Sequence, residues 1–271
     1  MSDIIKSYPH NTIIKEIAND DYHAHKAISS SNCKDLLKSP WLYWHNKNNP
    51  SKPTAAMELG SMVHKLILEP SDFDNEYMVA EIPKRTTKAG KAEYAELLEQ
   101  ANGRKLVALD DFLNAQEMRH NLGKNPVVRS LLSSGAAEQA TFWQDEQTGV
   151  ECKAKADFLN LDKGLIIDLK TTSDLASELC FKWTLNKYQY HLSAAFYQCG
   201  FKQALGEKCD FFFIVVETFA PFNYALYKIG EDLLERGYHL CNEALRVYKQ
   251  AESRGSFELP YNNGNLLELV A

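Results

Sequence analysis

The sequence predicts a single α/β domain in which helices flank a central mixed β-sheet. Residues 149–172 form two alternating segments joined by a turn signal that ends at Gly164, which is typical of a β-hairpin. The run at 209–217 is almost wholly apolar and predicts a buried strand, with 222–229 as its hairpin partner. Helical apolar spacing precedes and follows these strands, so we expect an α/β arrangement with helices against the sheet.

Composition limits the class of protein. The chain has 271 residues, 45% of them hydrophobic, which is enough for one large domain with its own core. We predict a lead-in over 1–27, the domain over 28–253 and a tail over 254–271. There is no apolar run of membrane-spanning length and no signal-peptide pattern, so we expect a cytoplasmic protein with no membrane partner. The six cysteines are scattered, which argues against a zinc site, disulfides or an iron–sulfur cluster.

Two helices predicted in the N-terminal third of the chain carry candidate functional residues. The run Ser29 to Asn32 resembles an N-cap series and opens a helix that ends near Pro40. A second helix over 55–69 stops at Pro70. Gly60 and His64 are four residues apart, so they share a face of this helix, and the glycine leaves room beside the histidine. Further helices are predicted over 92–101, 109–134 (in two segments), 187–205 and 231–251.

The most basic segment lies at 83–91 and includes Arg85 and Lys88. Such charge runs are usually solvated loops, but this one is also a candidate to grip backbone phosphates of DNA. The net charge of −6 argues against a simple basic DNA-binding domain. A local basic channel can still act on an acidic body, because steering depends on the local field.

A strand over 138–145 precedes the hairpin, so 138–170 is expected to form a three-stranded antiparallel meander. A turn centred between residues 162 and 163 sets Asp157 directly opposite Asp168. Carboxylates facing each other across a ladder have Cβ atoms about 5 Å apart, and like charges there are destabilising. Strand alternation places Lys170 on the same face as Asp168. One short hairpin therefore presents two acids and a lysine together.

These three side chains have a chemical interpretation. Two carboxylates can hold a hard divalent cation through oxygen. Such a cation lowers the pKa of a bound water and neutralises charge on a phosphoryl group, while a lysine positions the water or stabilises developing charge. The alternative is an exposed hairpin on which Asp157, Asp168 and Lys170 are merely solvated.

The pattern of Asp157, Asp168 and Lys170 resembles the PD-(D/E)XK nuclease signature, with Ala156 in place of the signature proline. More narrowly, the chain is similar to RecE-type exodeoxyribonucleases, the C-terminal nuclease domain of exonuclease VIII, and to the related lambda exonuclease group. The resemblance runs in order from about residue 15 to about residue 250 and is carried by four further stretches. These are Asn19-Asp20-Asp21-Tyr22-His23-Ala24, Ile28-Ser29-Ser30-Ser31, Leu59-Gly60-Ser61-Met62-Val63-His64 with Leu68-Glu69-Pro70, and Tyr190-His191 with Ala195-Phe196-Tyr197.

The resemblance implies a PD-(D/E)XK nuclease domain and a metal site. It implies that His64, Asp157 and Asp168 hold Mg²⁺, with Mn²⁺ as an alternative, and that Lys170 orients water. It also places an acidic residue near the site at Glu138, as a catalytic acid that supports the metal site rather than a certain ligand.

The resemblance further implies contacts with DNA. In the lambda exonuclease group a similar Ser/Thr helix start engages the 5′-phosphate, which makes Ser29 and Ser31 candidates, although a plain N-cap is an equal alternative. Tyr197 is a further DNA-binding candidate. Many relatives carry glutamine where this chain has Ser193, and that departure argues against active-site contacts from this helix.

The implied activity is a Mg²⁺-dependent 5′→3′ exonuclease that digests duplex ends and leaves 3′ overhangs. Its implied setting is recombination, often in a phage or prophage, with a RecT-like single-strand annealing partner and a ring-shaped trimer or tetramer around DNA. Two alternatives remain open. One is a RecB-like single-strand exonuclease or an endonuclease of the same superfamily, and the other is a non-catalytic DNA-binding or assembly module.

Overall fold

The computed structural model describes residues 6–258 and 261–268 of the chain. Its centre is a five-stranded sheet in the order β3-β4-β5-β6-β7. Neighbouring strands are antiparallel except β5 and β6, which are parallel, so the predicted mixed sheet and its antiparallel meander are confirmed. The strands are β3 (Ala136–Gln144), β4 (Glu151–Asn160), β5 (Leu165–Thr172), β6 (Asp210–Glu217) and β7 (Tyr224–Lys228).

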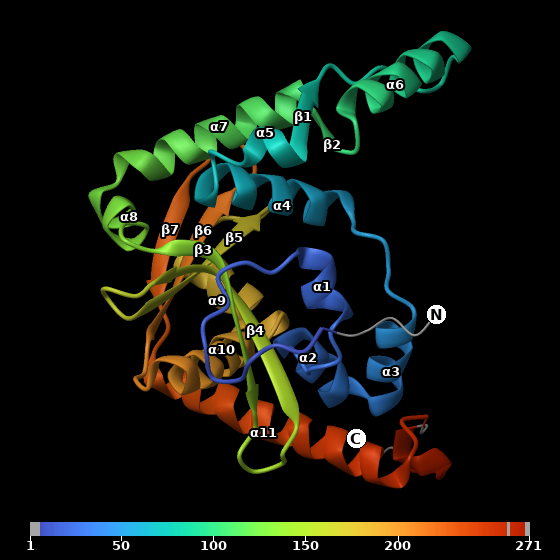
Figure 1. Cartoon of the computed structure of the whole chain (residues 1–271), viewed down its shortest axis with the longest axis vertical. Helices are drawn as coiled ribbons and strands as arrows, with labels where there is room; N and C mark the ends of the chain where they lie inside the picture. The colour runs from blue at the N-terminus through green and yellow to red at the C-terminus, as the bar shows by residue number, and fades with distance from the viewer. Residues whose placement is uncertain (1–5, 259–260, 269–271) are drawn as a thin grey trace.

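Helices cover both faces of this sheet, as Figure 1 shows. One core includes side chains of α2, α10 and α11, and the other includes side chains of α4, α7 and α8. Along β5, Ile166 belongs to the first core, whereas Ile167 and Leu169 belong to the second, as the two-residue period of a strand requires. The helices are α1 (Asn19–Ala24), α2 (Ser30–Lys38), α3 (Pro40–Asn48), α4 (Ala55–Leu68), α5 (Phe73–Glu76), α6 (Lys88–Ala101), α7 (Leu109–Lys124), α8 (Pro126–Leu131), α9 (Glu178–Lys187), α10 (Tyr190–Leu205), α11 (Glu231–Arg254) and the 3₁₀ turn η1 (Tyr261–Gly264).

Close packing of α10 against α11 depends on Gly237. A Cβ atom at this position would lie 2.2 Å from the carbonyl oxygen of His191, which is backbone and cannot move aside. The glycine therefore lets α11 lie directly against α10, and α10 in turn packs on β3 and β4. This packing of α11 on α10, and of α10 on the strands, covers one face of the sheet.

The N-terminal lead-in is tied to the sheet. The backbone N–H of Ile14 donates to the carbonyl of Ala140 at 2.8 Å, and the reverse bond is 3.0 Å, so Ile14 forms an isolated antiparallel bridge with β3. From β4, the buried Lys153 Nζ donates to the carbonyl of Tyr22 and, at 2.8 Å, to that of His25. These carbonyls lie at the C-terminal end of α1, where a cation is favourable.

The structure also contains a small second sheet that the sequence did not predict. It consists of β1 (Tyr77–Ala80) and β2 (Lys105–Ala108), which pair in parallel on either side of α6 in the sequence. Four-residue strands are too short to show a clear alternation, so the sequence pattern missed them.

Two predicted helix starts are wrong by a few residues. The helix α6 begins at Lys88 rather than at residue 92, because the Thr87 hydroxyl accepts from the backbone N–H of Gly90 at 3.0 Å and caps it. The helix α10 begins at Tyr190 rather than at residue 187, because Gln189 has a left-handed backbone, with φ of 51°.

No helix in the described ranges is both long and apolar enough to cross a bilayer.

Candidate active site

The predicted hairpin register is confirmed. The register pairs Phe158 with Ile167 and Asn160 with Leu165, and the ladder ends at Phe158. The same register extended by one residue sets Asp157 across from Asp168. The turn is closed by Gly164, whose φ of 61° is in the left-handed region that favours glycine. The two acids are thus brought together by pairing and turn geometry alone.

The ladder opens at the acids themselves. In place of a backbone carbonyl, the Oδ2 atom of Asp157 accepts from the backbone N–H of Leu169 at 2.8 Å. Burial raises the pKa of Asp157, the neighbouring His64 acts in the opposite direction, and the charge of Asp168 adds to the rise. The fold therefore keeps two like charges close together in a partly buried environment, which is unfavourable unless a cation neutralises them.

Lys170 supplies one positive charge to this face. Its Nζ contacts the Oδ1 atom of Asp168, whose side chain is only 7% exposed. Burial alone would lower the pKa of Lys170, but Asp168 and Asp157 outweigh it and raise the pKa, so the ammonium stays charged. The same Nζ lies 5.2 Å from the centroid of the Tyr190 ring, a cation–π distance.

His64 reaches the acids from α4, on the opposite side of the strands from α10. Its Nδ1 lies 3.5 Å from the Oδ2 of Asp157. One turn earlier, a Cβ atom at Gly60 would lie 3.3 Å from the Oγ1 of Thr171. The absence of a side chain at Gly60 therefore lets α4 approach the end of β5 closely, as the spacing of Gly60 and His64 indicated.

The donor chemistry of this site suits a divalent cation, although the donors are not assembled around one point. Two carboxylates and an imidazole are ordinary ligands for such an ion. Within the described residues, no three His, Cys, Asp or Glu side chains are close enough together to hold a metal as they stand. Asp168 Oδ1 faces Lys170 yet makes no hydrogen bond of good geometry within the described chain. A metal site at His64, Asp157 and Asp168 therefore requires these side chains to rearrange.

Glu138 lies beside this pair on the neighbouring strand. Its backbone φ is 55°, which is unusual for a non-glycine residue within a strand. The residues around it pair with β4, Ala137 with Phe158 and Gln139 with Ala156, so Glu138 stands across from Asp157. Its Oε2 lies 2.5 Å from the Nζ of Lys155. The structure thus places Glu138 near the acids, but with its carboxylate already paired.

Ser29 and Ser31 occupy the start of α2 with different surroundings. The Ser29 hydroxyl accepts from the backbone N–H of Asn32 at 3.4 Å, and the Asn32 side chain accepts from the Ser29 backbone at 3.1 Å. This is a complete capping box, so the N-cap alternative describes the geometry of Ser29. Ser31 is exposed. A phosphate role for these serines stays a prediction.

Tyr197 lies close to the acids despite the departure at Ser193. Burial raises the pKa of Tyr197, the charges of Asp168 and Asp157 raise it further, and a hydrogen bond with Ser30 acts in the opposite direction. Ser30 is itself buried, at 5% exposed. The structure therefore places Tyr197 beside Ser30 of α2, within range of the charges of the acid pair.

Sequence reasoning missed two residues at this site, Lys34 and Tyr190. The Nζ of Lys34 lies 5.3 Å from the Tyr190 ring centroid, so Lys34 and Lys170 both contact one tyrosine. Burial and then the charge of Lys170 lower the pKa of Lys34 to about 8. Ser30 and Lys34 are four residues apart on one helix, and that spacing was the available signal.

The basic segment is not part of this site. Arg85 lies in the turn before α6 and Lys88 is the first residue of that helix, and Figure 1 shows α6 at the far end of an arm with β1 and β2, away from the five-stranded sheet. The Arg85 guanidinium lies 4.6 Å from the centroid of the Tyr94 ring on that helix. The structure therefore does not bring Arg85 and Lys88 to the acids, and their DNA-binding role stays a prediction.

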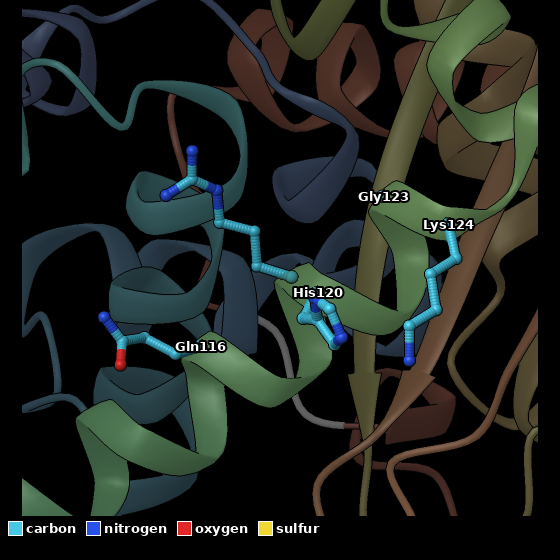
Figure 2. Close-up of a pocket in the computed structure, with 5 residues that line it drawn as sticks. Gln116, His120, Gly123 and Lys124 are labelled. Carbon is cyan, nitrogen blue, oxygen red and sulfur yellow. The ribbon is translucent and has the colours of Figure 1, made fainter.

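A hollow on α7 is also separate from the acids. Figure 2 shows it on the outer side of the helix. The side chains that α7 turns toward the core are Ala115, Met118 and Leu122. The hollow therefore carries no candidate catalytic residue. Its lining residues are Gln116, Arg119, His120, Gly123 and Lys124.

Comparison with known proteins supports the fold. A family model described as "PDDEXK-like domain of unknown function (DUF3799)" matches residues 29–260. A crystal structure from Eubacterium rectale, named "Putative exonuclease", is 17% identical with a TM-score of 0.65, over 94% of this chain and 96% of that one. At this identity the likeness shows the fold alone. A phage-related exonuclease from Haemophilus somnus is 14% identical over 86% of this chain and 97% of that one, and its TM-score of 0.36 carries no argument. No curated protein matches.

Proposed function

We propose, from the premise that this chain belongs to the family of PDDEXK-like domains DUF3799, that it is a metal-dependent nuclease that cuts phosphodiester bonds in DNA. The observation that carries the proposal is the β4–β5 register, which brings Asp157 and Asp168 to facing positions just where the backbone ladder ends, with Lys170 against Asp168. A structural hairpin gains nothing from two apposed acids, whereas a nuclease needs them.

We assign the metal to His64, Asp157 and Asp168, with Mg²⁺ as the expected ion and Mn²⁺ as an alternative. When bound, such an ion supplies a more acidic water and neutralises charge on the phosphoryl group. Lys170 keeps its proton, so it can turn from Asp168 toward a developing negative charge or hold a water near it. The Lys170 ammonium lies over the ring of Tyr190, and this contact limits the positions that the ammonium can take. Glu138 would serve as an acid beside the ligands.

The finer activity is proposed from the resemblance to RecE-type enzymes. We propose 5′→3′ digestion of double-stranded ends that leaves 3′ overhangs for recombination, with a RecT-like annealing protein as partner in the cytoplasm. We also propose a ring-shaped trimer or tetramer, since a chain with a net charge of −6 gains affinity for DNA by surrounding it. Ser29, Ser31 and Tyr197 are the proposed contacts to the DNA end.

The test is digestion of a linear duplex labelled at its 5′ or 3′ ends, with Mg²⁺ or EDTA. The wild type should remove label from the 5′ ends only with Mg²⁺, and Asp168→Ala should lower the rate at least about 10³-fold, since several kcal/mol of charge stabilisation are lost. Asp162→Ala is the matched control, because Asp162 is an exposed acid in the turn of the same hairpin. A closed circle should stay intact.

Other outcomes point to the alternatives. Cleavage of closed circles would indicate an endonuclease, and digestion of single strands only would indicate a RecB-like exonuclease. DNA binding without cleavage in Mg²⁺ or Mn²⁺ would contradict the proposal and favour a non-catalytic module.

A further inference from the structure

A ridge of apolar side chains lies on α9, the first helix after the catalytic strand β5. Leu179 and Trp183 are four residues apart and are 80% and 61% exposed, and Tyr188 just beyond the helix is 50% exposed. The opposite side of α9 already contributes Phe181 and Leu185 to the core. Large apolar side chains gathered on the outer side of such a helix mark a contact surface.

This surface also carries cations placed over its rings. The Nζ of Lys187 lies 4.5 Å from the Trp183 ring centroid and 5.1 Å from that of Tyr188. In the described parts of the chain no carboxylate pairs with Lys187, whereas Lys182 pairs with Glu178 at 2.5 Å. We call Leu179, Trp183, Lys187 and Tyr188 the α9 ridge. Its charge favours a polyanion over a purely apolar partner.

The α9 ridge is continuous with the candidate active site. The rings of Tyr188 and Tyr190 are stacked, with centroids 5.8 Å apart and an interplanar angle of 25°. Tyr190 in turn lies under Lys170 and Lys34. A continuous series of rings and ammonium groups therefore runs from the exposed Trp183 to the lysine beside the acids.

We propose that the α9 ridge binds a single-stranded segment of DNA next to the candidate active site, with bases on Trp183 and Tyr188 and a phosphate at Lys187. Aromatic rings with interleaved lysines are how proteins hold unpaired strands, since each base offers a flat face and each nucleotide a charge. A duplex hides those faces in its own stack, so the ridge should discriminate between the two forms. The proposal deepens, and in its setting rests on, the proposed nuclease function.

The test is binding of labelled oligothymidine and of a blunt duplex of equal length, in EDTA so that no strand is cut. Trp183→Ala should weaken single-strand binding about 10-fold, the range of one lost stacking contact, and affect the duplex much less. Lys187→Ala should lower the slope of log K against log salt by about 0.7, the value for one single-strand phosphate. Trp41→Ala is the matched control, because Trp41 is 45% exposed on a different helix, α3, and its loss should change nothing.

Unchanged oligothymidine binding by Trp183→Ala and Lys187→Ala would overturn the inference. So would an equal loss on the blunt duplex, or a change in oligomeric state in either variant, which would assign the ridge to a contact between copies. Cleavage by the wild type is measured in parallel with Mg²⁺. If the variants lose single-strand binding but the wild type cuts no DNA, the α9 ridge is supported and the nuclease function is refuted. If the wild type cuts DNA but the variants bind oligothymidine normally, the nuclease function is supported and the role of the ridge is refuted.

Discussion

The β4–β5 hairpin and the arm that ends in α6 both concentrate charge, but in opposite surroundings. On the hairpin, Asp157, Asp168 and Lys170 meet where the side chain of Asp168 is 7% exposed, and the charges of the two acids raise the pKa of Lys170. On the arm, Arg85 and Lys88 are both exposed, and the Arg85 guanidinium lies over the ring of Tyr94 on the adjoining helix α6.

The difference teaches which charge pattern in a sequence is informative. The residues of the hairpin are separated along the chain and converge only through strand register, against the cost of repulsion and burial. The residues of the arm are adjacent in the sequence and remain in water, where charge costs little. Charged residues that the fold brings together despite repulsion and burial therefore indicate function more strongly than a dense run of charges in the sequence.

After Asp168, the largest expected effect on cleavage is at Lys170. Lys170→Ala should lower the cleavage rate at saturating DNA by about 10²–10³-fold, because a preorganised cation beside the developing charge is lost. Lys202→Ala is the control, since Lys202 is an exposed lysine on α10. Thermal melting of both variants checks folding. A folded Lys170→Ala variant with the wild-type rate would contradict the assignment and remove the main distinction between hairpin and arm.

Lys153 tests whether a buried charge that is not close to the acid pair contributes to stability alone and not to cleavage. Its Nζ is held by carbonyls at the end of α1, and it is 3% exposed. Lys153→Met leaves those carbonyls without a donor and should lower the free energy of unfolding by about 1–3 kcal/mol. The cleavage rate of the folded variant should not change, which denaturant titration and the nuclease assay together will show.

The pH dependence of the wild type provides the second measurement on Lys153. Burial lowers the pKa of Lys153 from 10.5 to about 7, so the folded chain binds this proton less tightly than the unfolded chain. Between those pH values the unfolded state holds more protons. The free energy of unfolding should therefore rise with pH across that window, by at most about 1.4 kcal/mol per pH unit. Lys153→Met should lose this rise; an unaltered slope would mean that other groups produce it.

The sequence predicts the antiparallel meander and the acid pair because both depend on local rules. A turn at Gly164 and strict alternation set the register of Asp157 and Asp168, and the four-residue spacing of Gly60 and His64 sets the face of α4. The same rules give the buried strand at 209–217 and its partner.

Other features depend on how distant elements pack. The contact of Lys34 with Tyr190 joins α2 to α10 across the first core, and no local pattern encodes it. The left-handed backbone of Glu138 occurs inside a segment that reads as an ordinary strand. The arm was missed because β1 and β2 are short and pair across the whole of α6.

The smallest expected effect is at the arm. If Arg85 and Lys88 touch duplex phosphates, the double variant Arg85→Ala/Lys88→Ala should weaken binding and lower the salt slope by about 0.9 for each lost contact, with no change in the cleavage rate at saturating DNA. Arg119→Ala/Lys124→Ala is matched in charge and exposure, and it removes the cations around the α7 hollow. An equal loss in both double variants would mean that the arm contributes only net charge. A lower saturating rate in the arm variant alone would mean that α6 closes toward the acids on DNA, so that exposed and buried charge act in one site.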